Sequence, residues 1–207
     1  MDMTTMKIIL ALAATWGVPA KHEDVPNTYV KEEKEQHLDI LMHFPKGMTI
    51  DTRELQELGA TKIEDVVFEL KKSLYGLKQA GRLWSQLLNN RLLEAGFTRC
   101  ISDFCLYYKR DIDGVVIVGV YVDDLLVTGT PAVAVYVFFA SLESLSTKDI
   151  GPVSRYLGMR VTRNEDRGYF LDQEEAIVDL LRDHGMTDVN SSRAPIGTDV
   201  YEVHCAD

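Results

Sequence analysis

Two adjacent aspartates, Asp123 and Asp124, lie between two apolar, β-branched runs in the segment GVVIVGVYVDDLLVTGT, residues 114–130. Such runs predict strands covered on both faces, with the two carboxylates in a turn at the rim of the sheet. Charges placed there are costly unless a positive group neutralises them. No Lys or Arg lies within eleven residues of the pair on either side. The pattern therefore favours a bound cation; a hairpin turn with local Asp hydrogen bonds is the alternative.

The chemistry of carboxylate oxygen indicates which cation this would be. Hard oxygen ligands suit Mg²⁺ or Mn²⁺, which keep coordination positions for water and phosphate oxygens. Two such ions about 3.5–4 Å apart are a common arrangement for in-line displacement at phosphorus. The aspartate pair thus indicates phosphoryl-transfer chemistry.

Charge is distributed unevenly along the chain, whose net charge is −10. Residues 1–70 carry −6, residues 71–110 carry +6 and residues 111–207 carry −10. A polyanion would bind most favourably at the basic block in the middle. We expect any nucleic-acid affinity to depend mainly on Lys71, Lys72, Lys78 and Arg82, although exposed helix charges are the alternative for the last two.

Other residue patterns argue against several classes of protein. The three cysteines form no Cys-x-x-Cys pair and the five histidines are scattered, which argues against a disulfide framework or a zinc site. No stretch approaches the roughly 20 apolar residues of a transmembrane helix. The apolar run Ile8–Ala14 suits a buried helix, and a secretory signal at the short limit of length is the alternative.

Four segments occur in the order and at the spacing of motifs in one known family. They are EDVPNTYV at 23–30, SLYGLKQAGRLW at 73–84, YVDD at 121–124 and KDIG…RYLGMRV at 148–161. Together they resemble the reverse transcriptases of copia-type retrotransposons over nearly the whole chain, with Gly81 where the family usually has proline. The resemblance implies an intracellular RNA-directed DNA polymerase (in a cytoplasmic particle or the nucleus, without a membrane). Its partners would be an RNA or DNA template–primer and a deoxynucleoside triphosphate.

The resemblance also supplies a third carboxylate. Asp24 and Asp123 would bridge two Mg²⁺ or Mn²⁺ ions, with the backbone of Val25 as a further ligand and Asp124 beside the primer end. Tyr29 would exclude a ribose 2′-hydroxyl and so select deoxynucleotides. Judged without the family, Asp24 suits a strand end or turn and Tyr29 suits the core.

Further binding roles follow from the same motifs. Tyr75 and Gly76 would lie against the incoming nucleotide, and glycine there allows close approach of the backbone. The primer would contact two short segments, although strand and hairpin packing explain these residues equally well. The segments are Tyr121 with Val122, and Leu157 with Gly158 and Met159.

The positioning elements are mixed, so the sequence predicts an α+β fold. Helical spacing covers 77–97, 132–146 and 174–185, with Gly96 and Gly185 at two of the C-terminal ends. Residues 31–36 suit a charged turn or short helix. Strands are expected at 37–44, 65–70, 104–110, 115–122 and 125–129, and a hairpin joins 155–163 to 168–173.

The resemblance refines this expectation. It implies a palm-like antiparallel sheet with helices packed on one face, comprising residues 1–163, and a partial thumb or connection segment at 164–207. The fingers region would be largely missing, which would weaken catalysis and expose surface for association. The alternative is an inactive retrotransposon remnant that binds nucleic acid or protein.

Overall fold

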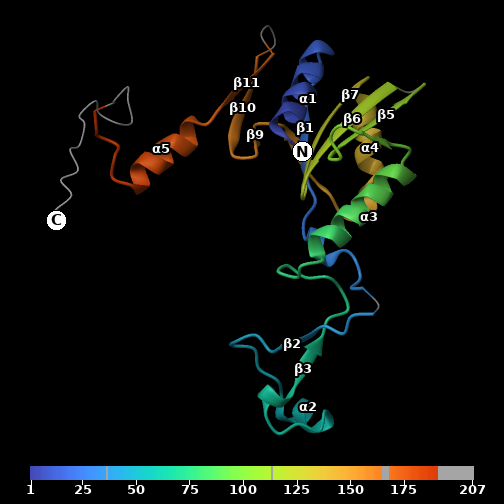
Figure 1. The fold of residues 1–207 in the computed structure, drawn as a ribbon, viewed down its shortest axis with the longest axis vertical. Helices are drawn as coiled ribbons and strands as arrows, with labels where there is room; N and C mark the ends of the chain where they lie inside the picture. The colour runs from blue at the N-terminus through green and yellow to red at the C-terminus, as the bar shows by residue number, and fades with distance from the viewer. Residues whose placement is uncertain (36, 113, 165–167, 191–207) are drawn as a thin grey trace, which may run out of the picture.

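The centre of the fold is a six-stranded antiparallel sheet in the order β4-β5-β6-β7-β1-β8. The computed structural model describes residues 1–35, 37–112, 114–164 and 168–190 (Figure 1). The strands of this sheet are β1 (Lys21–Asp24), β4 (Thr98–Arg99), β5 (Leu106–Asp111), β6 (Gly114–Tyr121), β7 (Asp124–Thr130) and β8 (Lys148–Pro152).

Helices cover both faces of this sheet. Leu125 and Val127 of β7 are buried in one cluster with α3 (Ala80–Glu94) and α4 (Val133–Ser141). Leu126, which points to the other face, is buried in a second cluster with α1 (Met3–Thr15). The expectation that helices pack on one face is therefore wrong. Consecutive apolar residues along β6 and β7 give the sheet two hydrophobic faces, and each face needs a cover.

Helix α1 packs closely because the sheet offers it a glycine. A Cβ on Gly119 of β6 would lie 2.4 Å from Sδ of Met1 and 2.6 Å from Cδ1 of Ile9, so a larger residue here would require these two side chains to shift. Asp2 caps the helix by accepting a hydrogen bond from the backbone N–H of Thr5 at 2.9 Å. Residues 8–14 lie within α1, where Ile9, Leu10 and Ala13 are buried, as expected for a buried helix.

A three-stranded sheet lies beside α1 (Figure 1). It contains β9 (Arg155–Tyr156), β10 (Met159–Asn164) and β11 (Gly168–Asp172), in the order β11-β10-β9. The expected pairing of 155–163 with 168–173 is confirmed for β10, but the expected strand 155–163 is broken by a turn at residues 157–158; residues 165–167 of the loop lie outside the described residues. Helix α5 (Glu174–Asp183) follows β11. The boundary expected between 163 and 164 falls inside β10, and the domain division stays a prediction.

The residues between β1 and α3 form an extension that projects from the central sheet (Figure 1). Its two strands pair with one another and are shorter than expected. The elements of the extension are η1 (Thr28–Val30), β2 (Leu41–His43), α2 (Thr52–Glu57), η2 (Ile63–Asp65) and β3 (Val67–Glu69).

Among the described helices, none is both long and apolar enough to cross a membrane.

The other expected helices are present. In α3, Trp84, Leu88 and Leu92 are buried at the spacing of one helix face, and Gly96 follows it with a φ of +84°. The expected helix at 132–146 is interrupted, because α4 ends at Ser141 and a 3₁₀ turn, η3 (Glu143–Leu145), replaces its last part. The α+β class is confirmed.

Candidate functional site

The register between β1 and β7 brings two of the three expected carboxylates together. Asp24 is the last residue of β1 and Asp124 the first of β7, and the two are direct cross-strand partners. Side chains of such partners lie on the same face of a sheet, with Cβ atoms about 4.5–5.5 Å apart. Asp24 and Asp124 thus lie side by side at the end of the central strands.

Asp123 is placed by the backbone of a strained turn. Tyr121 pairs with Asp124, so Val122 and Asp123 are the two central residues of the β6–β7 hairpin. Val122 has a φ of +55°, which is unfavourable for a β-branched residue. Two contacts hold the turn: the indole Nε1 of Trp84 donates to the Val122 carbonyl at 2.6 Å, and the Val25 N–H donates to the Asp123 carbonyl at 2.9 Å.

The electrostatics of Asp24 show that the three carboxylates are close and poorly neutralised. Burial raises the pKa of Asp24 above its usual value, and the negative charges of Asp123 and Asp124 raise it further. His22 and Lys148 act in the opposite direction and are outweighed. A cation would therefore bind favourably at this edge of the sheet.

The sequence analysis missed His22, which contacts the site directly. Its Nε2 lies 2.6 Å from Oδ1 of Asp124, and its ring packs edge-on against buried Tyr156 at a centroid distance of 5.2 Å. The sequence did contain an indication of this contact: His22 precedes Asp24 by two residues, and side chains two residues apart on a strand lie on the same face. His22 links the carboxylates to the β9–β10 hairpin.

The donor set fits a hard divalent cation, although it is not assembled into a complete coordination sphere. No three His, Cys, Asp or Glu side chains in the described part of the chain are arranged to hold a metal. Asp124 is already engaged by His22. The supporting feature is chemical: Asp24 pairs with Asp124 next to Asp123, and burial, together with the charges of Asp123 and Asp124, raises the pKa of Asp24.

The expected nucleotide-binding residues lie close together. The rings of Tyr29 and Tyr75 meet edge-on with centroids 4.7 Å apart. Gly76 has a φ of +93° with open space where a Cβ would be, so the backbone conformation explains this glycine. Tyr29 also lines a cavity of about 300 Å³ beside the β6–β7 turn, together with Trp84, Tyr121 and Val122.

Half of the expected basic contacts are already paired. Lys71 Nζ lies 2.5 Å from Glu69 Oε2, and Arg82 forms an ion pair with Glu35. Lys72 and Lys78 are exposed. Burial lowers the pKa of Lys31, and the nearby charge of Lys72 lowers it further, so these two ammonium groups are neighbours.

The expected primer-contacting hairpin has a two-residue turn. Tyr156 pairs with Met159, which leaves Leu157 and Gly158 in the centre with φ of +51° and +76°. Met159 is buried and Leu157 packs against the same core cluster as α1. Packing therefore accounts for two of the three residues, and the turn exposes Gly158.

A fourth carboxylate, Glu23, lies on the opposite face of β1. It is 3% exposed, and its Oε1 accepts from Thr147 Oγ1 at 3.1 Å. Its Oε2 has no hydrogen-bond partner among the described residues. Burial, with a smaller contribution from Asp149, raises the pKa of Glu23 to about 7.

Comparisons of the sequence with known proteins identify its family. Residues 1–198 match the family described as reverse transcriptase (RNA-dependent DNA polymerase). The chain is 29% identical over 197 residues to the retrovirus-related Pol polyprotein from transposon TNT 1-94 of Nicotiana tabacum, an alignment of 94% of this chain and 14% of that protein. It is 32% identical over 179 residues to the corresponding polyprotein from transposon RE1 of Arabidopsis thaliana, covering 86% of this chain and 11% of that protein.

A yeast relative extends the similarity beyond plants. The putative transposon Ty5-1 protein of Saccharomyces cerevisiae is 32% identical over 133 residues, which cover 64% of this chain and 43% of that protein. No solved structure matches the chain. The chain spans 11–14% of the length of the plant polyproteins. The chain therefore belongs to the reverse transcriptase family, and it is a reverse transcriptase domain of the kind found in copia-type retrotransposon Pol polyproteins.

Proposed function

We propose that the edge formed by Asp24, Asp123 and Asp124 is the catalytic centre of an RNA-directed DNA polymerase. The observation that carries this proposal is the cross-strand pairing of Asp24 with Asp124 next to a backbone-anchored Asp123. Burial raises the pKa of Asp24, and the negative charges of Asp123 and Asp124 raise it further. Carboxylates arranged in this way suit a phosphoryl-transfer reaction in which divalent cations bind both the carboxylates and the phosphate groups of the substrate.

The carboxylates and the backbone of Val25 would hold two Mg²⁺ or Mn²⁺ ions. When bound, such ions supply a lowered pKa for a primer 3′-hydroxyl and charge neutralisation for a triphosphate. The chain's own contribution is positioning. Val25 fixes Asp123 through its backbone N–H, and Trp84 holds the turn by its hydrogen bond to the Val122 carbonyl.

Selection of deoxynucleotides is assigned to Tyr29, and contact with the incoming nucleotide to Tyr75 and Gly76. Tyr29 and Tyr75 contact each other, and a fixed ring at this point would exclude a ribose 2′-hydroxyl. Lys72 and Lys78 are two exposed cations of the basic block that a template–primer could contact. We assign residues 1–163 to a palm and residues 164–207 to a partial thumb or connection segment, of which 165–167 and 191–207 lie outside the described residues.

Primer extension tests the proposal. The purified chain would be incubated with poly(rA)/oligo(dT), Mn²⁺ and dTTP beside the Asp123→Asn/Asp124→Asn variant. We expect extension by the wild type and none by the variant. A folded wild type that does not extend the primer, or a variant that extends it equally, would overturn the polymerase assignment.

One observation favours the alternative, a nucleic-acid-binding domain without polymerase activity. His22 occupies Oδ1 of Asp124, and an oxygen so engaged is a poorer metal ligand. In that case calorimetry should give the same Mn²⁺ binding for the wild type and for Asp123→Asn. Weaker Mn²⁺ binding by Asp123→Asn supports the polymerase assignment.

A further inference from the structure

Two arginines face each other across the β9–β10 hairpin. Arg155 and Arg160 are direct cross-strand partners, one residue outside the pair that closes the turn. Their side chains are 74% and 39% exposed. Like charges directly opposite one another in a sheet are destabilising unless an anion lies between them. This position therefore suits an anionic ligand.

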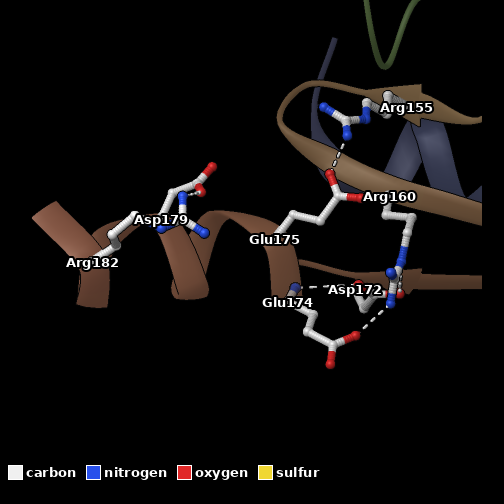
Figure 2. Close-up of polar contacts among 7 residues, drawn as sticks. All are labelled: Arg155, Arg160, Asp172, Glu174, Glu175, Asp179 and Arg182. Carbon is white, nitrogen blue, oxygen red and sulfur yellow. Dashed lines mark hydrogen bonds and ion pairs between the residues drawn. The ribbon is translucent and has the colours of Figure 1, made fainter. Parts of the chain in front are cut away.

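In the structure the anions come from the segment that follows the hairpin (Figure 2). Arg160 Nε lies 3.0 Å from Asp172 Oδ2, and its second nitrogen lies 2.6 Å from Glu174 Oε2. Arg155 forms an ion pair with Glu175. The three carboxylates, Asp172, Glu174 and Glu175, are referred to below as the acidic α5 start.

The attachment of α5 depends on these ion pairs. The helix buries none of its residues, and Ile177 and Leu180 are 55% and 58% exposed. A cavity of about 140 Å³ lies between the hairpin and the helix, lined by both arginines, Gly158 and Ala176. Exposed ion pairs stabilise a contact only weakly. The acidic α5 start is thus a cover that other anions can replace.

The arginines are connected to the carboxylate site through one neighbouring residue. Tyr156 follows Arg155, is 1% exposed and contacts the ring of His22. His22 in turn contacts Asp124. The hairpin is therefore anchored beside the proposed catalytic edge. Successive side chains alternate along a strand, so Arg155 and Arg160 lie on the hairpin face toward α5, which a strand that ends at Asp123 and Asp124 could reach by passing the turn.

We propose that Arg155 and Arg160 bind phosphate groups of a nucleic-acid backbone, and that the acidic α5 start covers them until phosphates displace it. The inference rests on the proposed function, because it places the strand end at the catalytic edge. A guanidinium group binds phosphate with the same forked geometry that it uses for carboxylate, so one anion can replace the other. The site adds two backbone contacts to the basic block around Lys72 and Lys78.

Salt-dependent binding without catalysis tests this inference. A fluorescein-labelled RNA template–DNA primer duplex would be titrated in EDTA at several NaCl concentrations, with anisotropy as the readout. For Arg155→Gln/Arg160→Gln we expect weaker binding, and a slope of log Kd against log salt lower by about two, one for each lost phosphate contact. Arg163→Gln/Arg182→Gln removes the same charge from β10 and α5 and should leave the slope nearly unchanged.

If the acidic α5 start covers the arginines, neutralising its carboxylates should tighten nucleic-acid binding instead of weakening it. Glu174→Gln/Glu175→Gln should tighten binding more than Glu143→Gln/Asp183→Asn, which removes the same charge at exposed positions away from the arginines. The extra gain should vanish when Arg155→Gln/Arg160→Gln is also present, because the carboxylates then have nothing to cover. Circular dichroism and urea unfolding would establish that each variant is folded.

The outcomes separate this inference from the proposed function. An unchanged salt slope for Arg155→Gln/Arg160→Gln, or equal gains for the two acidic variants, overturns the arginine site alone. Intact binding without primer extension overturns the polymerase assignment and leaves the arginine site supported if the slope falls. A folded wild type that binds no duplex at about 50 mM salt overturns both.

Discussion

Asp24, Asp123 and Asp124 lie at the edge of the central sheet, where no Lys or Arg of the described residues forms an ion pair with them and His22 contacts Asp124, whereas the acidic α5 start faces two arginines. The pKa values show the difference. Burial and neighbouring negative charge raise the pKa of Asp24, while hydrogen bonds from Arg160 and from the Glu174 backbone lower that of Asp172. The same side-chain chemistry is thus shifted in opposite directions.

The comparison separates two uses of carboxylates. At the sheet edge they are fixed by buried strands and lack compensation, so they would gain from a cation that binds from solution. At α5 they are exposed and compensated, so they can be exchanged for another anion. Removing one negative charge should therefore increase the stability of the fold at the sheet edge, whereas removing one charge from the ion pairs at α5 should weaken the attachment of that helix.

Asp24→Asn tests the uncompensated group and has the largest expected effect. Extension should fall about 10²–10³-fold, since removing one preorganised polar group from an active site commonly has that consequence. The variant should nevertheless unfold less readily than the wild type at neutral pH in EDTA. Because the pKa of Asp24 is raised in the folded state, its contribution to stability is present at low pH and is lost as the pH rises.

Urea unfolding at about pH 4 and about pH 7 would measure this gain, which should narrow at the lower pH because protonation removes the charge of the carboxyl. Asp183→Asn, at the exposed C-terminal end of α5, is the matched control. A variant that is less stable than the wild type at pH 7 would contradict the account of mutual repulsion.

Glu23→Gln tests burial without a metal-binding role. The folded-state pKa of Glu23 is about 7 against an ordinary 4.5, so the carboxyl favours folding fully below about pH 4.5 and progressively less up to about pH 7. Glutamine does not titrate. The variant should therefore gain up to about 3 kcal/mol of stability relative to the wild type between those pH values.

The measurement is the free energy of unfolding in urea at several pH values for both proteins. Glu64→Gln, at an exposed position in η2, is the control and should show no comparable trend. A constant difference between Glu23→Gln and the wild type from about pH 4 to about pH 8 would show that Glu23 titrates normally.

Trp84→Phe tests how the uncompensated site is held. The substitution keeps an aromatic ring in the core and removes the N–H that donates to the Val122 carbonyl. We expect a loss of about 1–2 kcal/mol of stability, because a partly buried carbonyl loses its partner. Trp16→Phe, at the C-terminal end of α1, should have a smaller effect in the same urea titration.

Arg160→Gln tests the compensated group and should have the smallest effect. Its ion pairs are exposed, so the global unfolding transition should coincide with that of the wild type in about 0.5 M NaCl, where such pairs are screened. Hydrogen exchange should instead increase locally in α5. A clear loss of global stability would show that α5 belongs to the cooperative core.

Local patterns were sufficient for several elements. Helix α3 follows from the spacing of Trp84, Leu88 and Leu92, and the β6–β7 hairpin follows from two apolar runs around Asp123 and Asp124. These signals are local, because side-chain periodicity and turn residues act over a few positions. The family assignment was also available from four motifs and is confirmed.

The positions of two elements in the fold could not be predicted from local sequence patterns. Strand β1, with the sequence KHED, is polar and short, yet it occupies an inner position of the sheet between β7 and β8. Helix α1 was recognised as apolar, but the face that it covers is set by packing against residues more than a hundred positions away, such as Leu126 and Tyr156. Pairing over such distances is decided by the packing of the whole sheet.

The sequence by itself determined which residues can carry the chemistry: two aspartates in a hydrophobic hairpin, a third suggested by motif resemblance, and a basic block. The tertiary structure decided how they meet. Register between β1 and β7 sets Asp24 against Asp124, brings His22 onto the same face and separates Glu23 onto the other. Side chains alternate along a strand, so a slip of one residue would exchange Asp24 and Glu23 between faces.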